Sequence, residues 1–318
     1  MTPLLFTTER HASWPSVGLS YLQLTKPRII FLLLVSTAGA MWIASEGQVS
    51  LYTLGVTLLG GAMAAGAANT LNCWYDADID RVMDRTRFRP IPAGRVAPHH
   101  ALMFAAGLAI AALLLLGTQT NWLAAGLAMA GLATYVGVYT LWLKRSSPQN
   151  IVIGGAAGAI PPLVGWAAVT GSLDWPAWVL FGLIFLWTPP HFWALAILLQ
   201  EDYARAEVPM LPVVVGNRPT AWQMWGYTLT LLPVSLLLVY PLGVMGPVYA
   251  VAALGLSAGF IYETWRFTGD PDNRQRARNL FKYSIYYILF LSLAMGLDTQ
   301  TGAIIDWVRA LGECAPVP

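Results

Sequence analysis

A row of polar side chains lies near the end of an apolar segment, where Asn72, Asp76, Asp80 and Asp84 recur every four residues. Because an α-helix has 3.6 residues per turn, this spacing drifts by only about 40° per step, so the four side chains are expected to share one helix face. Asp78 falls off that face. Carboxylates in such a row repel one another, so a cation is needed to offset their charge.

Mg²⁺ fits this row well, because it binds one or two carboxylates, keeps several waters and completes its shell with phosphate oxygens. We therefore predict that Asp76 and Asp80, helped by Asn72, hold Mg²⁺ on a diphosphate. The alternative is a membrane-surface helix whose aspartates pair with nearby arginines. Those arginines are Arg81, Arg85, Arg87 and Arg89. The metal site is favoured because the row begins inside an apolar span, where Asn and Asp are costly and usually functional.

Composition indicates a membrane protein. Of the 318 residues, 57% are hydrophobic and 11% are charged, whereas soluble domains carry about 25% charged residues. Cys73 and Cys314 lie far apart without metal-binding spacing, which excludes a disulfide framework and a zinc site. No nucleic-acid motif is present. The first 26 residues lack the features of a cleaved signal or a transit peptide, so a bacterial cell (inner) membrane is the expected location.

Apolar windows long enough to cross about 30 Å of hydrocarbon predict an all-α polytopic protein with nine transmembrane helices. The windows lie near 27–45, 51–73, 98–118, 121–143, 150–170, 176–200, 220–241, 246–265 and 281–300. All of the 18 basic residues except Arg309 lie before or at the start of the first window, between an even-numbered window and the next one, or at the start of that next window. Because basic residues stay on the cytoplasmic side, segment 1–26 is expected to be cytoplasmic and tail 301–318 external. The long loops 74–97 and 201–219 are then cytoplasmic, and so is the chemistry.

A second acidic cluster, with Asp202 at its centre, ends another even-numbered span. Asp202 is therefore a candidate ligand for a second metal ion facing the first. In the same span Pro189-Pro190 is expected to bend or interrupt the helix, as is Pro161-Pro162 one span earlier. His191 lies inside this span, either as a structural hydrogen-bonding residue or as a ligand.

Several motifs together resemble the UbiA-type intramembrane prenyltransferases, and in particular the branch that prenylates haem. The motifs are Leu24-Thr-Lys-Pro-Arg-Ile29, the Asn72 to Asp84 row with Arg85-Thr-x2-Arg89-Pro90, Tyr139-Thr-x3-Lys144-Arg145, Gly158-Ala-Ile-Pro-Pro-Leu-x-Gly165-Trp166, Pro190-His-Phe-Trp-Ala-Leu-Ala196 and Asp202-Tyr-x2-Ala-x2-Pro209-Met-Leu-Pro212. They span roughly residues 22–290. The polar row specifies the superfamily, whereas the arginine and Pro-His-Phe-Trp runs are typical of the haem branch.

The resemblance implies a ring of nine helices around a central, lipid-accessible cavity, with a prenyltransferase domain at 27–300 capped by the two long loops. It implies farnesyl diphosphate and haem b as substrates and Mg²⁺ as the ion. Asp76, Asp80 and Asp202 are the expected catalytic residues, and with Asn72 the expected metal ligands. The expected substrate-binding residues are Asn72, Asp84, Arg85, Arg89, Lys26, Arg28, Tyr139, Lys144 and His191. The superfamily's second Asp-x3-Asp motif is incomplete here, because Ala206 follows Asp202.

Bound Mg²⁺ improves pyrophosphate as a leaving group, while cationic side chains neutralise its charge. The resemblance implies that a haem vinyl group then captures the farnesyl cation and that water adds. Alternatives are a quinone-precursor or chlorin acceptor, a transporter, and a scaffold subunit. A transporter needs polar residues along its whole depth, and a scaffold needs no Asp/Arg cluster. Haem-pathway and terminal-oxidase assembly proteins are candidate partners, besides the lipid bilayer.

Overall fold

The computed structural model describes the backbone of residues 14–313 and the side chains of residues 17–300, and the regular structure in that part is entirely helical. The short helices are α1 (Trp14–Thr25), α4 (Ala77–Val82), α7 (Lys144–Ser146), α10 (Gln200–Arg205) and α11 (Leu211–Val215). The long ones are α2 (Pro27–Ala44), α3 (Leu51–Tyr75), α5 (Pro98–Gln119), α6 (Trp122–Ala133) with the π-helix η1 (Thr134–Leu143), α8 (Asn150–Thr170), α9 (Trp175–Leu198), α12 (Asn217–Leu236), α13 (Pro247–Thr268) and α14 (Arg274–Glu313). The start of the predicted segment 1–26 and the end of the tail 301–318 lie outside the described residues.

Seven helical segments in the described part are long and apolar enough to cross a membrane, which makes the chain a multi-pass membrane protein. They are Pro27–Ala44, Leu51–Tyr75, Pro98–Gln119, Trp122–Ser146, Asn150–Thr170, Trp175–Leu198 and Arg274–Gln300. The two other predicted windows coincide with α12 and α13, which have the required length. Both are less apolar than the seven, because α12 begins with Asn217 and Arg218 and α13 carries Glu263 and Arg266 near its end.

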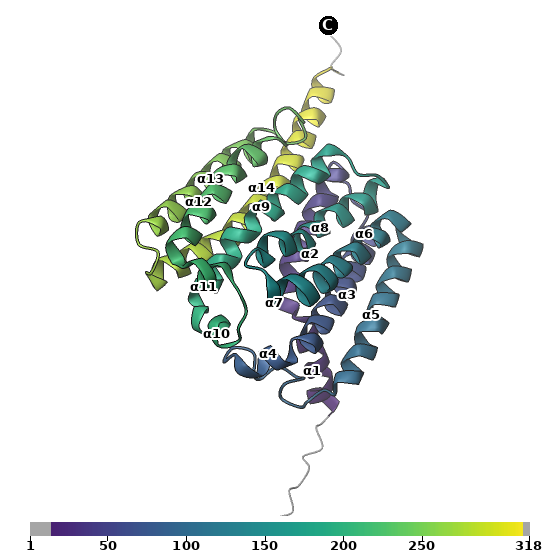
Figure 1. Cartoon of the computed structure of the whole chain (residues 1–318). Helices are drawn as coiled ribbons and strands as arrows, with labels where there is room; N and C mark the ends of the chain where they lie inside the picture. The colour runs from purple at the N-terminus through teal and green to yellow at the C-terminus, as the bar shows by residue number, and fades with distance from the viewer. Residues whose placement is uncertain (1–13, 314–318) are drawn as a thin grey trace, which may run out of the picture.

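The long helices pack side by side (Figure 1), and two kinds of contact hold them. Aromatic residues such as Trp193, Phe260 and Tyr287 belong to a buried cluster shared by α9, α13 and α14. Small residues instead let backbones approach: a Cβ added at Gly165 would lie 2.4 Å from the carbonyl oxygen of Thr37, so α8 and α2 touch there. This contact confirms the close packing that glycine and alanine favour between membrane helices.

The two Pro-Pro pairs do not interrupt their helices, so that part of the prediction is wrong. Pro161 and Pro162 lie within α8, and Pro189 and Pro190 lie within α9. Membrane helices tolerate proline where neighbouring helices and side chains satisfy the freed backbone groups. The irregular helix is instead η1, which contains no proline.

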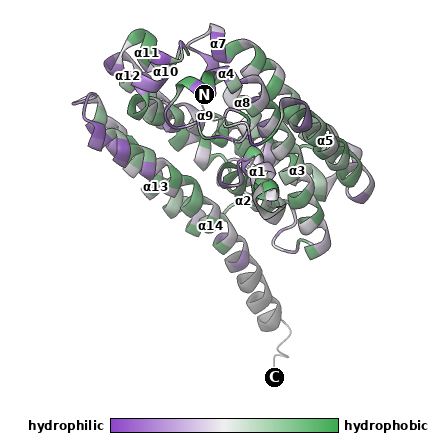
Figure 2. Cartoon of the chain, turned by 90° about the horizontal axis from the view of Figure 1, so that it is seen from below, coloured by the Kyte–Doolittle hydropathy of each residue, from purple (hydrophilic) through white to green (hydrophobic). Residues whose placement is uncertain are grey.

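Hydrophilic residues gather at one end of the bundle, around α4, α7 and α10, whereas the long helices are mostly hydrophobic (Figure 2). The helices α4 and α10 lie near each other in both views (Figures 1 and 2). They follow α3 and α9, so the two acidic clusters of the sequence meet at the same end of the fold.

Candidate functional site

The backbone between α3 and α4 keeps a helical path, which aligns the first acidic cluster. The N–H of Asp76 donates to Asn72 O at 2.9 Å, and the N–H of Asp80 donates to Asp76 O at 2.8 Å. Asn72, Asp76 and Asp80 are accordingly buried together, at 3%, 0% and 2% exposure. The side chain of Asp78 is 63% exposed. The predicted face is thus confirmed for these four residues.

Asp84 is not part of that face, contrary to the prediction. The helix α4 ends at Val82, and Met83 has an extended backbone. The side chain of Asp84 is therefore turned outward and is 58% exposed. A four-residue spacing predicts a shared face only while the helix continues.

Each buried carboxylate is paired with a cation from another segment. Asp76 Oδ2 accepts hydrogen bonds from Lys144 Nζ and, at 2.6 Å, from Asn72 Nδ2. Asp80 accepts from Arg89 Nη1, at 2.8 Å to each oxygen. Burial opposes the charge of Arg89, yet the contact with Asp80 raises the pKa of this guanidinium above its usual value. The carboxylates and cations of the first cluster thus form a buried and electrically balanced network.

Lys26 joins this network from the start of α2. Its Nζ donates to Asn72 Oδ1 at 2.7 Å, and burial lowers the pKa of its ammonium group. Its backbone is left-handed, with φ 57° and ψ 63°, a conformation that costs a non-glycine residue about 1–2 kcal/mol. Backbone strain of this kind concentrates at functional sites.

The π-helix η1 explains how residues from the fourth span reach the same point. An α-helix would place Tyr135 and Lys144 about half a turn apart, since each residue advances about 100°. In a π-helix residues five apart line up: the Lys144 N–H donates to Tyr139 O, and Thr140 Oγ1 donates to Tyr135 O at 2.9 Å. Thr140 thereby meets Asn72 Nδ2 at 3.1 Å, while Lys144 meets Asp76.

Three tyrosines lie beside the ionic network, namely Tyr135, Tyr139 and Tyr203. The sequence analysis identified only Tyr139 as a site residue. Tyr135 and Tyr139 stack with ring centroids 5.4 Å apart. Tyr135 is close enough to Asp76 for the carboxylate charge to act on its hydroxyl group. The same holds for Tyr203 of α10 and Asp202. The unbroken apolar pattern of residues 122–143 gives no sign of the π-helix that presents Tyr135.

The second acidic cluster is held differently. Asp202, which is 8% exposed, contacts the guanidinium of Arg205 one turn later on α10. The same nitrogen, Arg205 Nη2, donates to Asp84 Oδ2 at 2.7 Å. This hydrogen bond holds the pKa of the Asp84 carboxyl below its usual value. Asp84 and Arg205 are both more than half exposed, so these contacts are screened by solvent.

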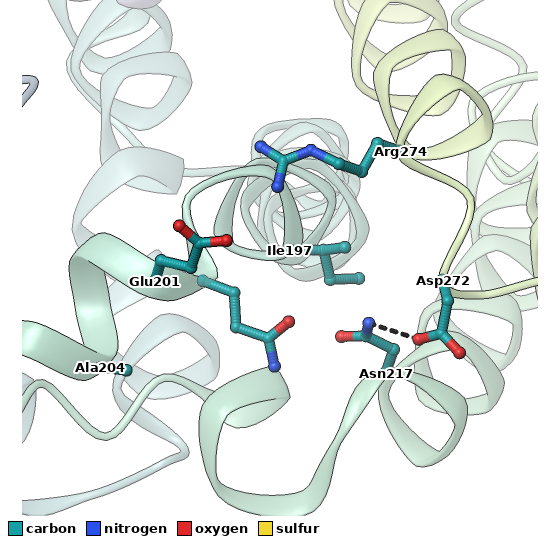
Figure 3. Close-up of a pocket in the computed structure, with 7 residues that line it drawn as sticks. Ile197, Glu201, Ala204, Asn217, Asp272 and Arg274 are labelled. Atoms are coloured by element: carbon teal, nitrogen blue, oxygen red, sulfur yellow. Dashed lines mark hydrogen bonds between the residues drawn. The ribbon is translucent and has the colours of Figure 1, made fainter.

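A pocket of about 290 Å³ opens on the other face of α10 (Figure 3). Ile197, Gln200, Glu201, Ala204, Asn217, Asp272 and Arg274 line it. Asn217 Nδ2 donates to Asp272 Oδ1 at 2.8 Å across it. None of the predicted site residues lines this pocket, so it is separate from the network around Asp76.

His191 and Arg28 lie apart from the network. His191 Nδ1 is 2.7 Å from Ser284 Oγ, and its ring stacks between Trp187 and Phe281 at centroid distances of 4.3 and 4.8 Å. His191 thus makes the hydrogen bond expected of a structural residue, to a side chain of α14. Arg28 is exposed at the start of α2, and Arg85 is exposed but lies within electrostatic range of Tyr139 and Tyr203.

The donor set of the first cluster consists of oxygen atoms, as hard cations require. Asp76 Oδ1 is buried and accepts no hydrogen bond, and Arg145 Nη2 lies 3.6 Å from it. Across the described residues no three His, Cys, Asp or Glu side chains converge as a metal site. A cation here would therefore share its coordination with a ligand or with water.

Comparisons with known proteins identify the family of the chain. The model of the UbiA prenyltransferase family matches residues 32–291. The chain is 60% identical over 311 residues to a protoheme IX farnesyltransferase from Cyanothece sp., covering 97% of this chain and 96% of that one. It is 64% identical over 275 residues to one from Thermosynechococcus vestitus, covering 86% and 87%.

Two solved structures have the same fold. One is a digeranylgeranylglyceryl phosphate synthase, with a TM-score of 0.75, 20% identity and coverage of 89% of this chain and 98% of that one. The other is a UbiA homologue from Archaeoglobus fulgidus bound to DMAPP and Mg²⁺, with a TM-score of 0.61, 16% identity and coverage of 87% and 99%.

Proposed function

Since the chain belongs to the UbiA prenyltransferase family, we propose that it transfers the farnesyl group of farnesyl diphosphate to a vinyl group of haem b, forming haem O. The observation that carries the choice of substrates is the identity of about 60% over nearly the whole chain with protoheme IX farnesyltransferases. The buried pairing of Asp76 and Asp80 with cations supports a site for a metal-bound diphosphate. The prenyltransferase domain runs from residue 27 to 300 in this proposal.

Mg²⁺ fits the first cluster. Asn72, Asp76 and Asp80 offer oxygen ligands, and the free Oδ1 of Asp76 is a ready acceptor. With so few carboxylates in reach, the ion would complete its shell with diphosphate oxygens and waters, as Mg²⁺ commonly does. The A. fulgidus homologue bound to DMAPP and Mg²⁺ supports this assignment. When bound, the ion withdraws charge from the leaving pyrophosphate.

The cations that now pair with the aspartates have a second use in this proposal. Lys144 and Arg89 are close enough to the carboxylates to turn to the diphosphate once a metal ion takes their place. Arg85 and Lys26 approach the same region from the loop and from α2. Arginine is suited to this role because its fork of donors matches phosphate oxygens. Asp202 would hold a second ion or its waters from α10.

His191 is proposed to contact haem through Nε2. Both 2.7 Å contacts of Ser284 Oγ are satisfied when its hydroxyl donates to Phe281 O and accepts from His191 Nδ1–H, and we propose this tautomer. The neutral ring then carries its lone pair on Nε2, the form that binds iron or accepts a hydrogen bond. Trp187 and Phe281 fix the ring plane on both sides.

The membrane topology is also proposed. The nine windows correspond to helices in the described residues, and most of the basic residues lie in the connections that follow α3, η1, α9 and α13 or in the helix turns that border those connections. A nine-span ring in the bacterial inner membrane, with these loops cytoplasmic and capping the site, follows from the positive-inside rule. Cysteine probes at Phe88, Ala204 and Asp272, which are exposed, should react only from the cytoplasm. Labelling of any two from opposite sides contradicts nine spans.

The decisive experiment is a reaction of the purified chain in lipid nanodiscs with Mg²⁺, farnesyl diphosphate and haem b, followed by mass analysis. We expect haem b that has gained a farnesyl group and a hydroxyl group, with pyrophosphate released, and no product when EDTA replaces Mg²⁺. Parallel reactions with a quinone precursor and a chlorin measure the acceptor range. A chain that prenylates either of those but not haem b would contradict the proposed acceptor, and no transfer to any acceptor would contradict the proposed activity.

A further inference from the structure

We propose that Arg205 is a positioning residue, which tethers Asp202 on α10 to Asp84 on the loop that follows α4. The proposal rests on the proposed function, because it assigns Asp202 a place over the diphosphate site. It also gives the outlying Asp84 a role: Asp84 anchors the second acidic cluster instead of extending the first. The second motif is incomplete, because Ala206 stands where the superfamily has a carboxylate. In this proposal the loop that follows α4 supplies a carboxylate, Asp84, that holds Arg205 and through it Asp202.

The geometry of the contact is specific. One nitrogen, Arg205 Nη2, contacts both Asp202 Oδ1 and Asp84 Oδ2. Two hydrogen bonds of ordinary length to one nitrogen keep their acceptor oxygens within about 6 Å of each other. Asp84 and Arg205 are 121 residues apart in the chain. The guanidinium therefore fixes the distance between two loops that the sequence leaves independent.

Apolar contacts alone do not provide this alignment. One buried apolar cluster contains Ile79 and Met83 beside the first acidic cluster and Tyr203 beside the second. The two segments therefore already share a hydrophobic core. Hydrophobic contact is non-directional and does not orient a carboxylate. The ionic contact is directional, and it is made by the side chain next to Asp202 on the same face of α10.

The energy of the contact decides where its effect is measured. Ion pairs between side chains that are half exposed change an equilibrium by about fivefold at most, and both Arg205 and Asp84 are more than half exposed. Loss of the tether should therefore leave the protein folded. The effect should appear in the spread of loop positions and in the affinity for farnesyl diphosphate.

Arg87 provides a matched control. Its Nη1 lies 3.5 Å from Asp84 Oδ1, and its side chain is 54% exposed, close to the 51% of Arg205. Arg87→Gln removes the same charge from the same carboxylate without touching α10. A purely electrostatic effect of loop charge would appear equally in both variants, whereas a tether effect appears only in Arg205→Gln.

The first measurement uses spin labels on Phe88→Cys and Ala204→Cys, both exposed positions, in a chain whose two native cysteines are replaced. Distance distributions are recorded by pulsed EPR in nanodiscs without substrate. We expect Arg205→Gln and Asp84→Asn to broaden the distribution equally, the double variant to add nothing, and Arg87→Gln to leave it unchanged. An unchanged distribution in Arg205→Gln, or equal broadening in Arg87→Gln, overturns the tether. This readout needs no catalysis, so it stands apart from any failure of the proposed function.

The second measurement is the KM for farnesyl diphosphate with haem b as acceptor. Arg205→Gln and Asp84→Asn should each raise KM about fivefold, the limit set by an exposed ion pair, with kcat nearly unchanged. Arg205→Lys should show a smaller rise in KM, because the ammonium group keeps the positive charge although it lacks the planar guanidinium. If kcat instead falls about 100-fold while KM stays the same, Arg205 acts on the reacting groups themselves and the positioning role is overturned.

Discussion

The two acidic clusters have the same place in the sequence, because each ends an even-numbered apolar span, but the structure builds them in different ways. In the first cluster Asp76 and Asp80 are buried, and each is paired with a cation that another segment supplies. In the second cluster Asp202 is paired with Arg205 on its own short helix, and this cation is half exposed. The first is a rigid site enclosed by long helices, whereas the second depends on a surface contact.

This difference indicates that the two clusters have different roles. Buried and paired charges are costly to disturb, so we expect the first cluster to keep its geometry when substrate is absent. A short helix with an exposed ion pair moves at little cost. We therefore expect the second cluster to adjust its position more readily than the first, and the following four predictions test that contrast.

The largest effect is expected at the first cluster. Asp76→Asn or Asp80→Asn should lower kcat/KM by about 10³-fold or more, since each removes an oxygen ligand used in the leaving-group step. Asp78→Asn is the matched control, because this neighbouring carboxylate is exposed, and its loss should change kcat/KM less than about threefold. Steady-state kinetics with haem b measures all three. Equal losses at the three positions would refute the assignment by helix face.

A smaller effect is expected at the second cluster. Asp202→Asn should lower kcat/KM by about 10- to 100-fold, because a single carboxylate on a movable helix holds its ion less firmly. The same assay measures this change, and Glu201→Gln, which lines the separate pocket, serves as the control. If Asp202→Asn is as damaging as Asp76→Asn, the two clusters are equally essential and the proposed difference in roles fails.

The contrast also predicts stability. Lys144→Met should reduce the free energy of unfolding by about 3–5 kcal/mol, because it leaves the buried Asp76 without its cation. Arg205→Met should cost less than about 1 kcal/mol. Denaturant unfolding in detergent micelles measures both. Adding Asp76→Asn to Lys144→Met should recover most of the loss, and a double variant as unstable as the single one would show that Lys144 acts through packing.

The smallest effect concerns pH at the exposed pair of Asp78 and Arg145. Hydrogen bonds of 2.7 and 2.8 Å from Arg145 lower the pKa of Asp78 to about 2. A lowered carboxyl pKa stabilises the folded state above the unfolded value of about 3.9, and this stabilisation disappears as the pH falls toward 2. Because Asp78 is exposed, the difference between the protein and Asp78→Asn should be below about 1 kcal/mol at pH 5 and vanish near pH 2. A difference that grows on acidification would contradict the pairing.

Sequence patterns predicted much of this arrangement. Hydropathy located every long helix, because apolar length is what the bilayer selects. The four-residue spacing placed Asn72, Asp76 and Asp80 together and Asp78 outside. It failed at Asp84 because nothing in the local pattern marks Val82 as the end of α4.

Contacts between distant segments lay beyond prediction. The partners of Asn72 and Asp84 are set by how helices and loops meet in space, so Thr140 and Arg205 carried no signal of their own. The prolines of α8 and α9 were misleading, since proline signals a missing donor but not whether the surroundings compensate. His191 was recognised as unusual, yet its partner Ser284 lies 93 residues away.

Because of the π-helix, the number of residues in the fourth span determines whether Lys144 can reach Asp76. Deleting one residue from Thr134–Leu143 would leave composition and hydropathy almost unchanged and would allow an ordinary α-helix to form. The part of the helix beyond the deletion would then rotate by about 100°, and Lys144 would point away from Asp76. Two chains with the same residue types in this span therefore share the site only if they also agree in length, which makes a single alignment gap here more telling than several substitutions.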